Sequence, residues 1–223
     1  MLVAIKSIAF NSVFILLLLI SPLVNHASVF VNHENHYTET MNRLPIKHCR
    51  ACGASVVYRL PDDGDTKLRA VCTACHTVHY ENPLNVVGTV PTWGEDGGQV
   101  LLCKRNIEPR WGKWTLPAGF MELDETSAEG AARETVEEAG AQFEMQNLFT
   151  LMNVVKVGQV HLFYRAKLLS SHFNPGSETI EARLFSETEI PWDELAFRTV
   201  RETLELYFKN RRANKFDFHV MDL

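Results

Sequence analysis

The sequence predicts an α/β protein in which a mixed β-sheet lies between helices, preceded by a small cysteine-rich segment. From residue 85 onward, runs rich in β-branched and aromatic residues alternate with helical stretches. Residues 127–139 carry helix start and stop signals, and two Cys-x2-Cys pairs lie upstream. A chain of 223 residues with 46% hydrophobic and 22% charged residues supports one globular domain plus such an appendage.

Cys49 with Cys52, and Cys72 with Cys75, predict a four-cysteine zinc site. Each pair places two thiolates on one turn, and tetrahedral Zn²⁺ needs two such pairs. Two disulfides, or a site that has lost its metal, explain the paired spacing less well. Because four thiolates complete the coordination shell, we expect a structural zinc that stabilises a segment of about 40 residues with too little core to fold alone.

The remaining residues around this segment have simpler expected roles. His48, His76 and His79 are expected at the surface or beside the thiolates, not as ligands. A local excess of Lys and Arg could bind nucleic acid, but stabilisation is the preferred role of the segment. Cys103, in the apolar run 100–103, is expected to be a small buried side chain.

Hydrophobic periodicity predicts the strands and the last helix. The expected strands are residues 85–92, 99–104, 149–157, 160–168 and 182–185. Residues 192–209 have the spacing of an amphipathic helix. Its inward face is expected to carry Leu195, Val200, Leu204 and either Tyr207 or Phe208.

The helix at 127–139 is expected to have one packed face and one acidic face. Thr126, with Glu129 three residues later, is a capping signature, and Gly140 stands where the helix should end. The residues expected to pack inward are Ala128, Ala132, Thr135 and Ala139, while Glu134, Glu137 and Glu138 fall within a sector of roughly 100° on the other side.

The acidic face indicates a divalent metal site. Like charges on adjacent turns repel by roughly a few tenths of a kcal/mol per pair in water, and by more in a dry cleft. Oxygen ligands without a soft partner select Mg²⁺ or Mn²⁺. Arg133 is expected to pair with Glu137 and hold it in one rotamer. The alternative is a solvated acidic surface.

Residues 119–141, GFMELDETSAEGAARETVEEAGA, contain a longer pattern. It resembles the Nudix box, G-x5-E-x7-R-E-U-x-E-E-x-G-U with U apolar, and all polar and glycine positions match: Gly119, Glu125, Arg133, Glu134, Glu137, Glu138 and Gly140. Thr135 and Ala141 fill the apolar positions, a mild departure. The resemblance implies a Nudix hydrolase with an α/β/α sandwich, which cleaves a pyrophosphate joining a nucleoside to a group X.

The resemblance also assigns roles to single residues. Glu134, Glu138 and the backbone carbonyl of Ala118 look like metal ligands, and Glu137 is either a third ligand or part of the general base. Gly119 and Gly140 look structural, the first for a tight loop entering the helix and the second as its cap. Glu125 is expected to hold that loop in shape. Plain turn glycines and a surface acid are the alternative interpretation.

The segment that leads into the acidic helix, residues 104–120, is expected to contact the substrate. Arg105 or Arg110 could bind the diphosphate, and Trp111 or Trp114 could cover a base or ring. Tryptophans are more often core residues than stacking platforms, so burial in the core is the alternative for both.

Residues 175–185, PGSETIEARLF, supply candidates for a further acid. In relatives, an acid near this point often reaches the metal site or acts as the base, and E-A-R-L-F resembles that segment. Glu181 is the first choice and Glu178 the second, with an exposed loop acid as the alternative. In the expected mechanism, a carboxylate deprotonates a metal-bound water for in-line attack on phosphorus, and two monophosphates leave.

From about residue 47 to 209 the chain resembles the zinc-ribbon Nudix group that includes ADP-ribose and FAD pyrophosphatases. NADH pyrophosphatases share ribbon and box, but their S-Q-P-W-P-F-P-x-S signature is missing from residues 142–162. We therefore expect FAD or ADP-ribose to be preferred over NADH. A hydrolase of modified nucleoside triphosphates or of capped RNA is the runner-up. A noncatalytic nucleotide sensor or zinc-ribbon interaction module is the rival from another class.

The net charge of −5 argues against a nucleic-acid-binding surface over the whole molecule. The resemblance implies a small nucleotide as the partner. A homodimer is compatible with the family. The expected divisions are residues 1–40, a hydrophobic N-terminal segment; 41–83, the zinc ribbon; 84–211, the hydrolase domain; and 212–223, a C-terminal tail.

The N-terminal segment conflicts with this interpretation. Residues 7–24 fit a signal peptide or short membrane anchor, which would export the protein or attach it to a membrane. Export would place four zinc thiolates in an oxidising compartment, where disulfides compete. We therefore favour a cytoplasmic protein that starts at Met41, with residues 1–40 added by an overextended gene model.

Overall fold

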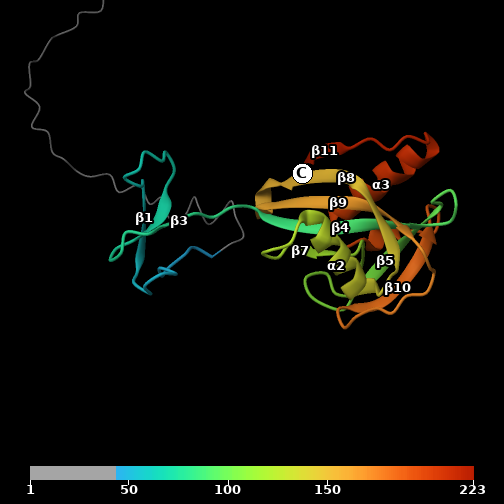
Figure 1. Cartoon of the computed structure of the whole chain (residues 1–223), viewed down its shortest axis with the longest axis horizontal. Coiled ribbons are helices and arrows are strands. Elements are labelled where there is room, and N and C mark those ends of the chain that lie inside the picture. The colour runs from blue at the N-terminus through green and yellow to red at the C-terminus, as the bar shows by residue number, and fades with distance from the viewer. Residues whose placement is uncertain (1–43) are drawn as a thin grey trace, which may run out of the picture. The chain divides into compact units, whose positions relative to one another are not determined.

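The computed structural model describes residues 44–223 (Figure 1). The predicted anchor at 7–24 and the proposed start at Met41 lie outside these described residues. Between residues 44 and 223, none of the helices has the length and apolar character that crossing a bilayer requires.

The cysteine-rich segment forms a small sheet of its own. Its strands are β1 (Val56–Arg59), β2 (Arg69–Cys72) and β3 (Val78–His79), in the order β1-β2-β3 with antiparallel pairing. Cys72 closes β2, and Val71 is fully buried between its neighbours. The sequence predicted the cysteine pairing of this segment and not its strands.

The larger domain is built on one eight-stranded mixed sheet. The strand order along the sheet is β10-β5-β4-β9-β8-β11, with short β6 paired to β5 and β7 paired to β4. Pairs β4–β9 and β8–β11 are parallel, and the other pairs are antiparallel. The strands are β4 (Leu84–Trp93), β5 (Gln99–Arg105), β6 (Trp114–Thr115), β7 (Ala118–Phe120), β8 (Phe143–Val154), β9 (Gln159–Leu168), β10 (Thr179–Ser186) and β11 (His219–Asp222).

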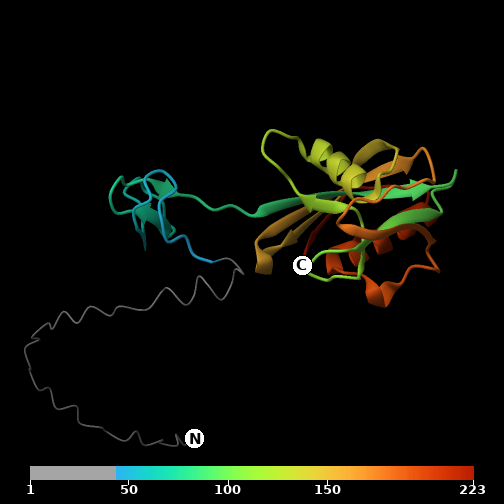
Figure 2. The ribbon, with the colours of Figure 1, turned by 90° about the horizontal axis from the view of Figure 1, so that it is seen from below.

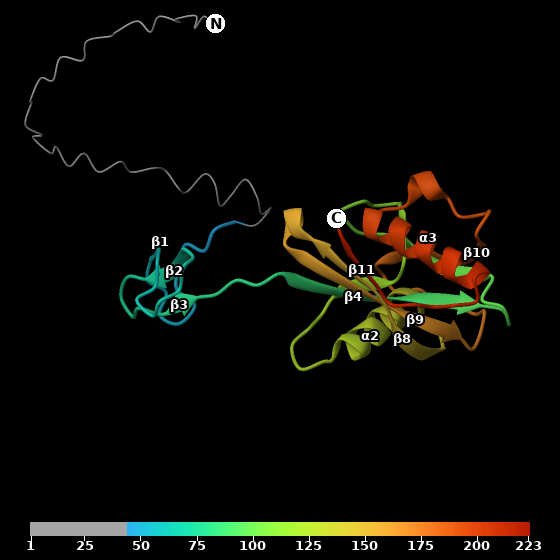
Figure 3. The same ribbon diagram turned by 90° about the horizontal axis from the view of Figure 1, so that it is seen from above.

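Helices α2 (Ser127–Ala139) and α3 (Arg198–Arg212) cover opposite faces of this sheet (Figures 2 and 3). Alternation along β4 explains the two layers, since successive side chains point to opposite faces. Thr89 contacts Thr135 of α2, whereas Val90 belongs to the core cluster that includes Leu204 of α3. The predicted mixed sheet between helices is confirmed.

The strand predictions are confirmed in position and differ at their ends. β8 begins at Phe143, well before the predicted residue 149, and residues predicted to end it form the 3-10 turn η1 (Val155–Val157). Gly158 explains this turn, because its φ of 62° is left-handed and its N–H donates to the carbonyl of Val155. β6, β7 and β11 were not predicted, and β11 comes from the segment expected to be a tail.

The last predicted helix, 192–209, is wrong at its start. Residues 192–194 form the 3-10 turn η2 (Trp192–Glu194), and α3 begins only at Arg198. Between them the chain is extended, because Leu195 pairs with Trp114 and the Ala196 N–H donates to the Trp114 carbonyl at 2.8 Å. The predicted inward face is confirmed: Val200, Leu204, Tyr207 and Phe208 are buried, and Leu195 is partly buried against the same cluster.

Candidate functional site

Helix α2 has the predicted boundaries and caps. The Thr126 hydroxyl accepts from the Glu129 N–H at 3.2 Å, and the Glu129 carboxylate accepts from the Thr126 N–H at 2.8 Å. At the other end Gly140 has a φ of 59°, and its N–H donates to the carbonyl of Val136 at 2.7 Å. Both ends are therefore fixed by hydrogen bonds that the capping signature implied.

The inner face of α2 explains why a threonine stands where an apolar residue was expected. Thr135 is fully buried and donates to the carbonyl of Ala131 at 2.7 Å. Its oxygen is also 2.7 Å from the hydroxyl of Thr89 on β4, so both hydroxyls are satisfied without water. Ala131 and Ala139 are the buried alanines, while the predicted Ala128 and Ala132 are half-buried.

Arg133 organises the outer face of α2. Its guanidinium donates to Glu125 at 2.9 Å, to Glu134 at 2.7 Å and to Glu137 at 3.1 Å. It also donates to the carbonyl of Phe120. The Arg133 bonds, together with the Glu122 N–H, lower the pKa of Glu125 to about 2. The expected pair with Glu137 is therefore one of several Arg133 contacts. The contacts with Glu125 and Phe120 connect the helix to the loop before it.

Two glycines allow close approach beside this helix. A Cβ on Gly119 would overlap the Glu134 carboxylate, and a Cβ on Gly88 would overlap Pro117 and Ala118. Gly88 lies opposite Ala118 in the β4–β7 pair. Because neither glycine has a side chain, the Glu134 carboxylate can lie against the backbone of β7.

A cavity of about 790 Å³ opens between the acidic face of α2, β7 and the start of α3. Its acidic lining residues include Glu134, Glu137, Glu138 and Glu178, and Ala118 and Arg105 also line it. The cavity volume lies within the range of about 300–1,000 Å³ typical of small-molecule sites. The predicted carboxylates therefore share one enclosed space.

Electrostatics within the cavity are dominated by Glu138, which is only 7% exposed. Burial raises the pKa of its carboxyl to about 8; the Ala118 N–H opposes the shift and the charge of Glu134 adds to it. The Ala118 N–H donates to Glu138 Oε2 at 3.2 Å. Burial also raises the pKa of Glu134, against the opposing bond from Arg133. A cation bound between the two carboxyls would favour their ionised forms and oppose both shifts.

In the small domain, the four cysteines form one cluster. Their sulfur atoms all lie within 4.8 Å of one another, and the Cys52 sulfur is 3.4 Å from those of Cys72 and Cys75. The thiols are free, so these are not disulfides. Four sulfurs around a tetrahedral zinc with bonds of about 2.3 Å would stand about 3.8 Å apart, which the cluster fits.

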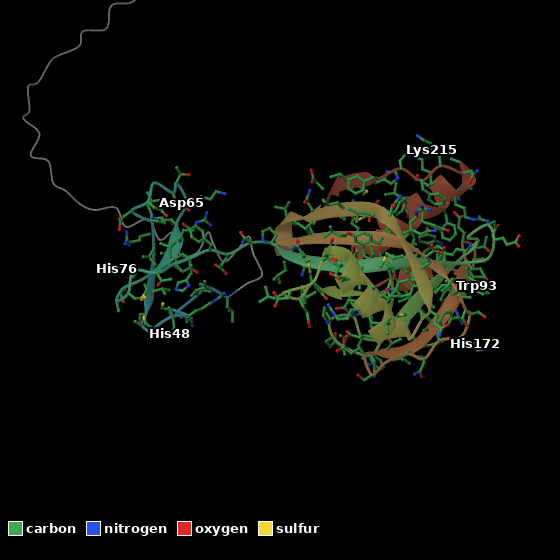
Figure 4. The ribbon with its side chains drawn as sticks, in the orientation of Figure 1. His48, Asp65, His76, Trp93, His172 and Lys215 are labelled. Carbon is green, nitrogen blue, oxygen red and sulfur yellow. The ribbon has the colours of Figure 1, made fainter. Side chains whose placement is uncertain are left out.

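None of the neighbouring histidines joins that cluster, as expected. His48 and His76 are exposed on the same small domain, where Figure 4 labels them, and His79 is buried at the end of β3. Backbone N–H groups point at the sulfurs instead, from Ala51 to Cys49 and from Ala74 to Cys72, each at 3.4 Å. Such bonds favour thiolates over thiols.

Comparison with known families decides what these two sites belong to. A family model described as NUDIX domain matches residues 83–207, which is more than half of the chain. A second model, described as Nudix N-terminal, matches residues 47–81. The chain belongs to the Nudix hydrolase family.

Several proteins are similar to this Nudix chain. The crystal structure of a NUDIX hydrolase from Nitrosomonas europaea is 47% identical, has a TM-score of 0.75 and matches 80% of this chain and 99% of its own. A MutT-like protein of Streptomyces ambofaciens is 35% identical over 85 residues, which are 38% of this chain and 53% of that protein. The NAD-capped RNA hydrolase NudC of Photobacterium profundum is 28% identical over 144 residues, 64% of this chain and 51% of that protein. The chain spans about half the length of these two curated relatives.

The donor set of the Nudix cavity fits a hard divalent cation. Glu134, Glu138 and the backbone at Ala118 line the cavity together, and the carboxylate and carbonyl oxygens of these residues are the hard donors that Mg²⁺ and Mn²⁺ prefer. The raised pKa of Glu138 reflects the cost of a negative charge in this buried position, and a bound cation would offset that cost. Nudix enzymes use divalent metals, and this set of oxygen atoms could hold Mg²⁺ or Mn²⁺.

Of the residues in 104–120 predicted to contact the substrate, only Arg105 lines the cavity. Arg105 lines it, is 8% exposed, donates to the Pro109 carbonyl at 2.9 Å and stacks on Phe197 with its guanidinium carbon 5.2 Å from the ring centre. Arg110, with a φ of 69°, and Trp111, 61% exposed, are not among the lining residues.

Trp114 is placed in the core, not in the substrate site. It is 4% exposed, and its ring lies edge-on against Phe185 at 4.9 Å between centroids. Its place in β6, paired with Lys104 of β5, fixes this orientation. Trp114 is therefore buried in the core, which was the alternative to stacking on a base. Its ring has no free face on which a base could stack.

Of the two downstream acids, Glu178 lines the cavity and Glu181 does not. Glu181 lies in β10 opposite Lys104, with its carboxylate 3.8 Å from Arg183. A register shift between Thr179 and Glu181 separates the two acids, and the Glu178 carbonyl is anchored by the Asn106 N–H at 2.8 Å. The structure therefore brings the second-choice acid, Glu178, to the cavity and not the first choice, Glu181, and periodicity did not reveal this local irregularity.

The sequence analysis missed the lining residues on β9 and α3. Gln159, His161, Phe197 and Thr199 all line the cavity. A histidine inside the apolar strand sequence QVHLFY was the available signal, because a buried polar residue in a strand needs a partner. Phe197 and Thr199 gave no such signal, because the helix predicted at 192–209 began too early and its expected inward face did not include them.

Proposed function

We propose that the chain hydrolyses the pyrophosphate bond of a nucleoside diphosphate linked to X, in the presence of Mg²⁺ or Mn²⁺, and releases two monophosphates. FAD and ADP-ribose are the favoured substrates. The supporting observation is the convergence of four carboxylates and one buried guanidinium on a single cavity: Glu134, Glu137, Glu138, Glu178 and Arg105.

The proposed roles follow from charge and position. Glu134 and Glu138, with the carbonyl of Ala118, would hold the cation, and Glu137 would be a third ligand or part of the base. A divalent ion held by these residues would supply positive charge for the diphosphate and a lowered pKa of a bound water. Arg105 would bind phosphate oxygens from the opposite side, because a guanidinium matches phosphate geometry.

Glu178 is the preferred general base. It stands in the cavity outside the Arg133 network, so its carboxylate is free to accept a proton from the attacking water. The water oxygen then forms its bond to phosphorus as the bridging oxygen leaves on the second phosphate. Arg133 positions Glu134 and Glu137 and touches no reacting atom in this proposal.

A second candidate is the hydrolysis of NAD-capped RNA, favoured by the similarity to the Photobacterium profundum hydrolase of that name. Free NADH and modified nucleoside triphosphates share the same reacting group. A noncatalytic sensor is disfavoured, because every carboxylate of the box is present and three of them line the cavity.

A substrate panel tests the proposal. FAD, ADP-ribose, NADH, 8-oxo-dGTP and NAD-capped RNA would each be incubated with Mg²⁺, with Mn²⁺ and with neither, and the products identified by mass. FMN with AMP from FAD, or ribose 5-phosphate with AMP from ADP-ribose, is the expected outcome. Cleavage of the capped RNA alone would replace the first candidate function by the second. If no substrate of the panel is cleaved, both candidates are overturned.

The proposal includes the setting of the enzyme. We propose the zinc ribbon at 41–83, the hydrolase domain at 84–211, a structural Zn²⁺ held by the four cysteines, and a possible homodimer. Reduced thiolates and dinucleotide substrates suit the cytoplasm, which is the proposed location.

A further inference from the structure

The loop that carries Glu178 is held between two other parts of the hydrolase domain. We call residues 174–178 the Glu178 loop; it leads into β10, and Gly176, Ser177 and Glu178 line the cavity. Glu178 is exposed, so the position of its carboxylate depends on how the loop backbone is held. A general base must stay within hydrogen-bond reach of the proton it accepts. The contacts of this backbone therefore bear on the proposed reaction.

On one side, the Glu178 loop packs against the end of α2. The Asn174 N–H donates to the carbonyl of Ala139 at 3.0 Å. Gly176 lies so close to the backbone of Glu137 that an added Cβ would overlap the Glu137 carbonyl oxygen. These two contacts hold the first half of the loop against the helix that carries the box acids.

On the other side, Asn106 holds the second half of the loop with its backbone and its side chain. Its N–H donates to the Glu178 carbonyl at 2.8 Å, and its Nδ2 donates to the Ser177 carbonyl at 2.9 Å. Its Oδ1 accepts from the Trp111 indole N–H at 3.3 Å. The indole nitrogen only donates and the carbonyl only accepts, so the carboxamide of Asn106 fits in one orientation.

Asn106 itself is not among the residues that line the cavity, whereas its neighbours Arg105 and Ile107 are. Arg105 is held by bonds of its own: its Nε donates to the Pro109 carbonyl at 2.9 Å and its N–H to the Lys113 carbonyl at 2.9 Å. Removal of the Asn106 side chain would therefore free the Glu178 loop without releasing the guanidinium proposed to bind phosphate.

We propose that Asn106 is a positioning residue for the general base. Its carboxamide holds the Ser177 carbonyl and thereby keeps the Glu178 carboxylate where it can accept a proton from the attacking water. This rests on the proposed function and deepens it. Asn106 touches no reacting atom, and its contribution is geometric: a misplacement of about 1 Å can lower a rate by about 100-fold.

Steady-state kinetics of the full chain on the best substrate of the panel test this role. Asn106→Ala keeps the backbone bond to Glu178 and loses the bond to Ser177, so kcat should fall about tenfold. KM should change less than about twofold, because the cation ligands and Arg105 keep their own contacts. Asn147→Ala is the matched control: Asn147 is exposed on β8, lies outside the cavity and should leave both constants unchanged.

A double-mutant cycle assigns the effect to Glu178. In Glu178→Gln the proposed base is already absent, so adding Asn106→Ala should lower kcat no further. An equal fall in both backgrounds would overturn the proposal, because Asn106 would then act through another group or through the fold in general. Asn106 is exposed, so its truncation leaves no buried cavity, and thermal unfolding of each variant checks that it folds.

Amide hydrogen exchange followed by mass spectrometry measures the loop without any turnover. In Asn106→Ala, the amides of residues 176–179 should exchange about fivefold faster than in the wild type, while those of α2 keep their rates. Unchanged exchange in the loop would overturn the proposal even if kcat fell. A chain that cleaves no substrate of the panel and still shows faster loop exchange in Asn106→Ala would overturn the proposed reaction and retain Asn106 as the residue that holds the loop.

Discussion

At the scale of single residues, the Nudix cavity contains carboxyls whose environments differ although their chemistry is the same. Arg133 holds Glu125 ionised, whereas burial raises the pKa of Glu138 to about 8. The sequence motif identified both residues, because the resemblance fixes positions. It gave no sign of how deeply each is buried, since burial depends on how β7 and β4 pack against the helix.

Replacing Glu138 by Gln is expected to lower the turnover number by roughly 100-fold or more, because a carboxylate proposed to hold the catalytic cation loses its charge without a change in volume. Steady-state kinetics on the best substrate of the panel would measure it. Glu144→Gln, on an exposed part of β8, is the matched control and should retain full activity. A Glu138→Gln enzyme with wild-type turnover would remove Glu138 from the mechanism.

The same residue predicts a pH dependence of stability. Its folded pKa, about 8, is above the ordinary glutamate value of 4.5, so between these values the unfolded state loses a proton that the folded state keeps. Without divalent metal, the contribution of Glu138 to stability is therefore present below pH 4.5 and is lost as pH rises toward 8. In Mg²⁺-free buffer at pH 8, Glu138→Gln should be more stable than the wild type, by on the order of 2 kcal/mol. Equal urea midpoints at pH 8 would contradict this prediction.

Arg133, which also lines the cavity, depends on the planar shape of its guanidinium. Arg133→Lys keeps the charge but cannot contact Glu125, Glu134 and Glu137 together, because an ammonium lacks the planar fork. We expect a loss of about 1–2 kcal/mol of unfolding free energy and a fall in turnover of about tenfold. Chemical denaturation and kinetics would measure both. Arg198→Lys, which changes an exposed pair with Glu202, should leave both nearly unchanged.

At the scale of elements, local signals predicted α2 and failed at the start of α3. The capping box and the left-handed Gly140 are local features, so the sequence contained them. The extended link before α3 depends on hydrogen bonding of Ala196 to Trp114, more than eighty positions earlier in the chain, and no local pattern carries it. The bulge between Thr179 and Glu181 has the same character, which is why the sequence did not indicate that Glu178, and not Glu181, lines the cavity.

The cap of α2 gives a prediction about this element. Thr126→Ala should lower the unfolding free energy by about 1 kcal/mol, since the Glu129 N–H loses its acceptor. Thr126→Ser keeps the hydroxyl and should be close to the wild type. Thermal unfolding monitored by circular dichroism separates the two variants. Equal destabilisation by Ser and Ala would show that the methyl group, not the hydroxyl, is responsible.

At the scale of the whole molecule, two kinds of stabilisation stand side by side. The larger domain buries aromatic and aliphatic side chains on both faces of an eight-stranded sheet, whereas the ribbon has three short strands and four clustered thiols. Composition and cysteine spacing predicted this division. The sequence could not predict the order of strands in the sheet, because that order is set by pairing between distant segments.

Metal analysis tests the ribbon. The purified protein should contain about one zinc ion per chain, and Cys72→Ser should lose most of it. We expect the variant to become sensitive to protease within residues 47–81 while the helical circular dichroism signal of α2 and α3 persists. Cys103→Ser, at a buried cysteine outside the cluster, is the control that should retain zinc. Wild-type protein purified without zinc and still resistant to protease would argue against a metal-stabilised ribbon.

Gly88 and Gly119 carry a consequence for how this chain can diverge. Each stands where only a hydrogen atom fits, one against Ala118 and the other against the Glu134 carboxylate. Substitution of either glycine is therefore expected to be disfavoured as the sequence of this chain changes. A larger residue at Gly88 would require a different contact between β4 and β7. A larger residue at Gly119 would require the Glu134 carboxylate to move or to be replaced.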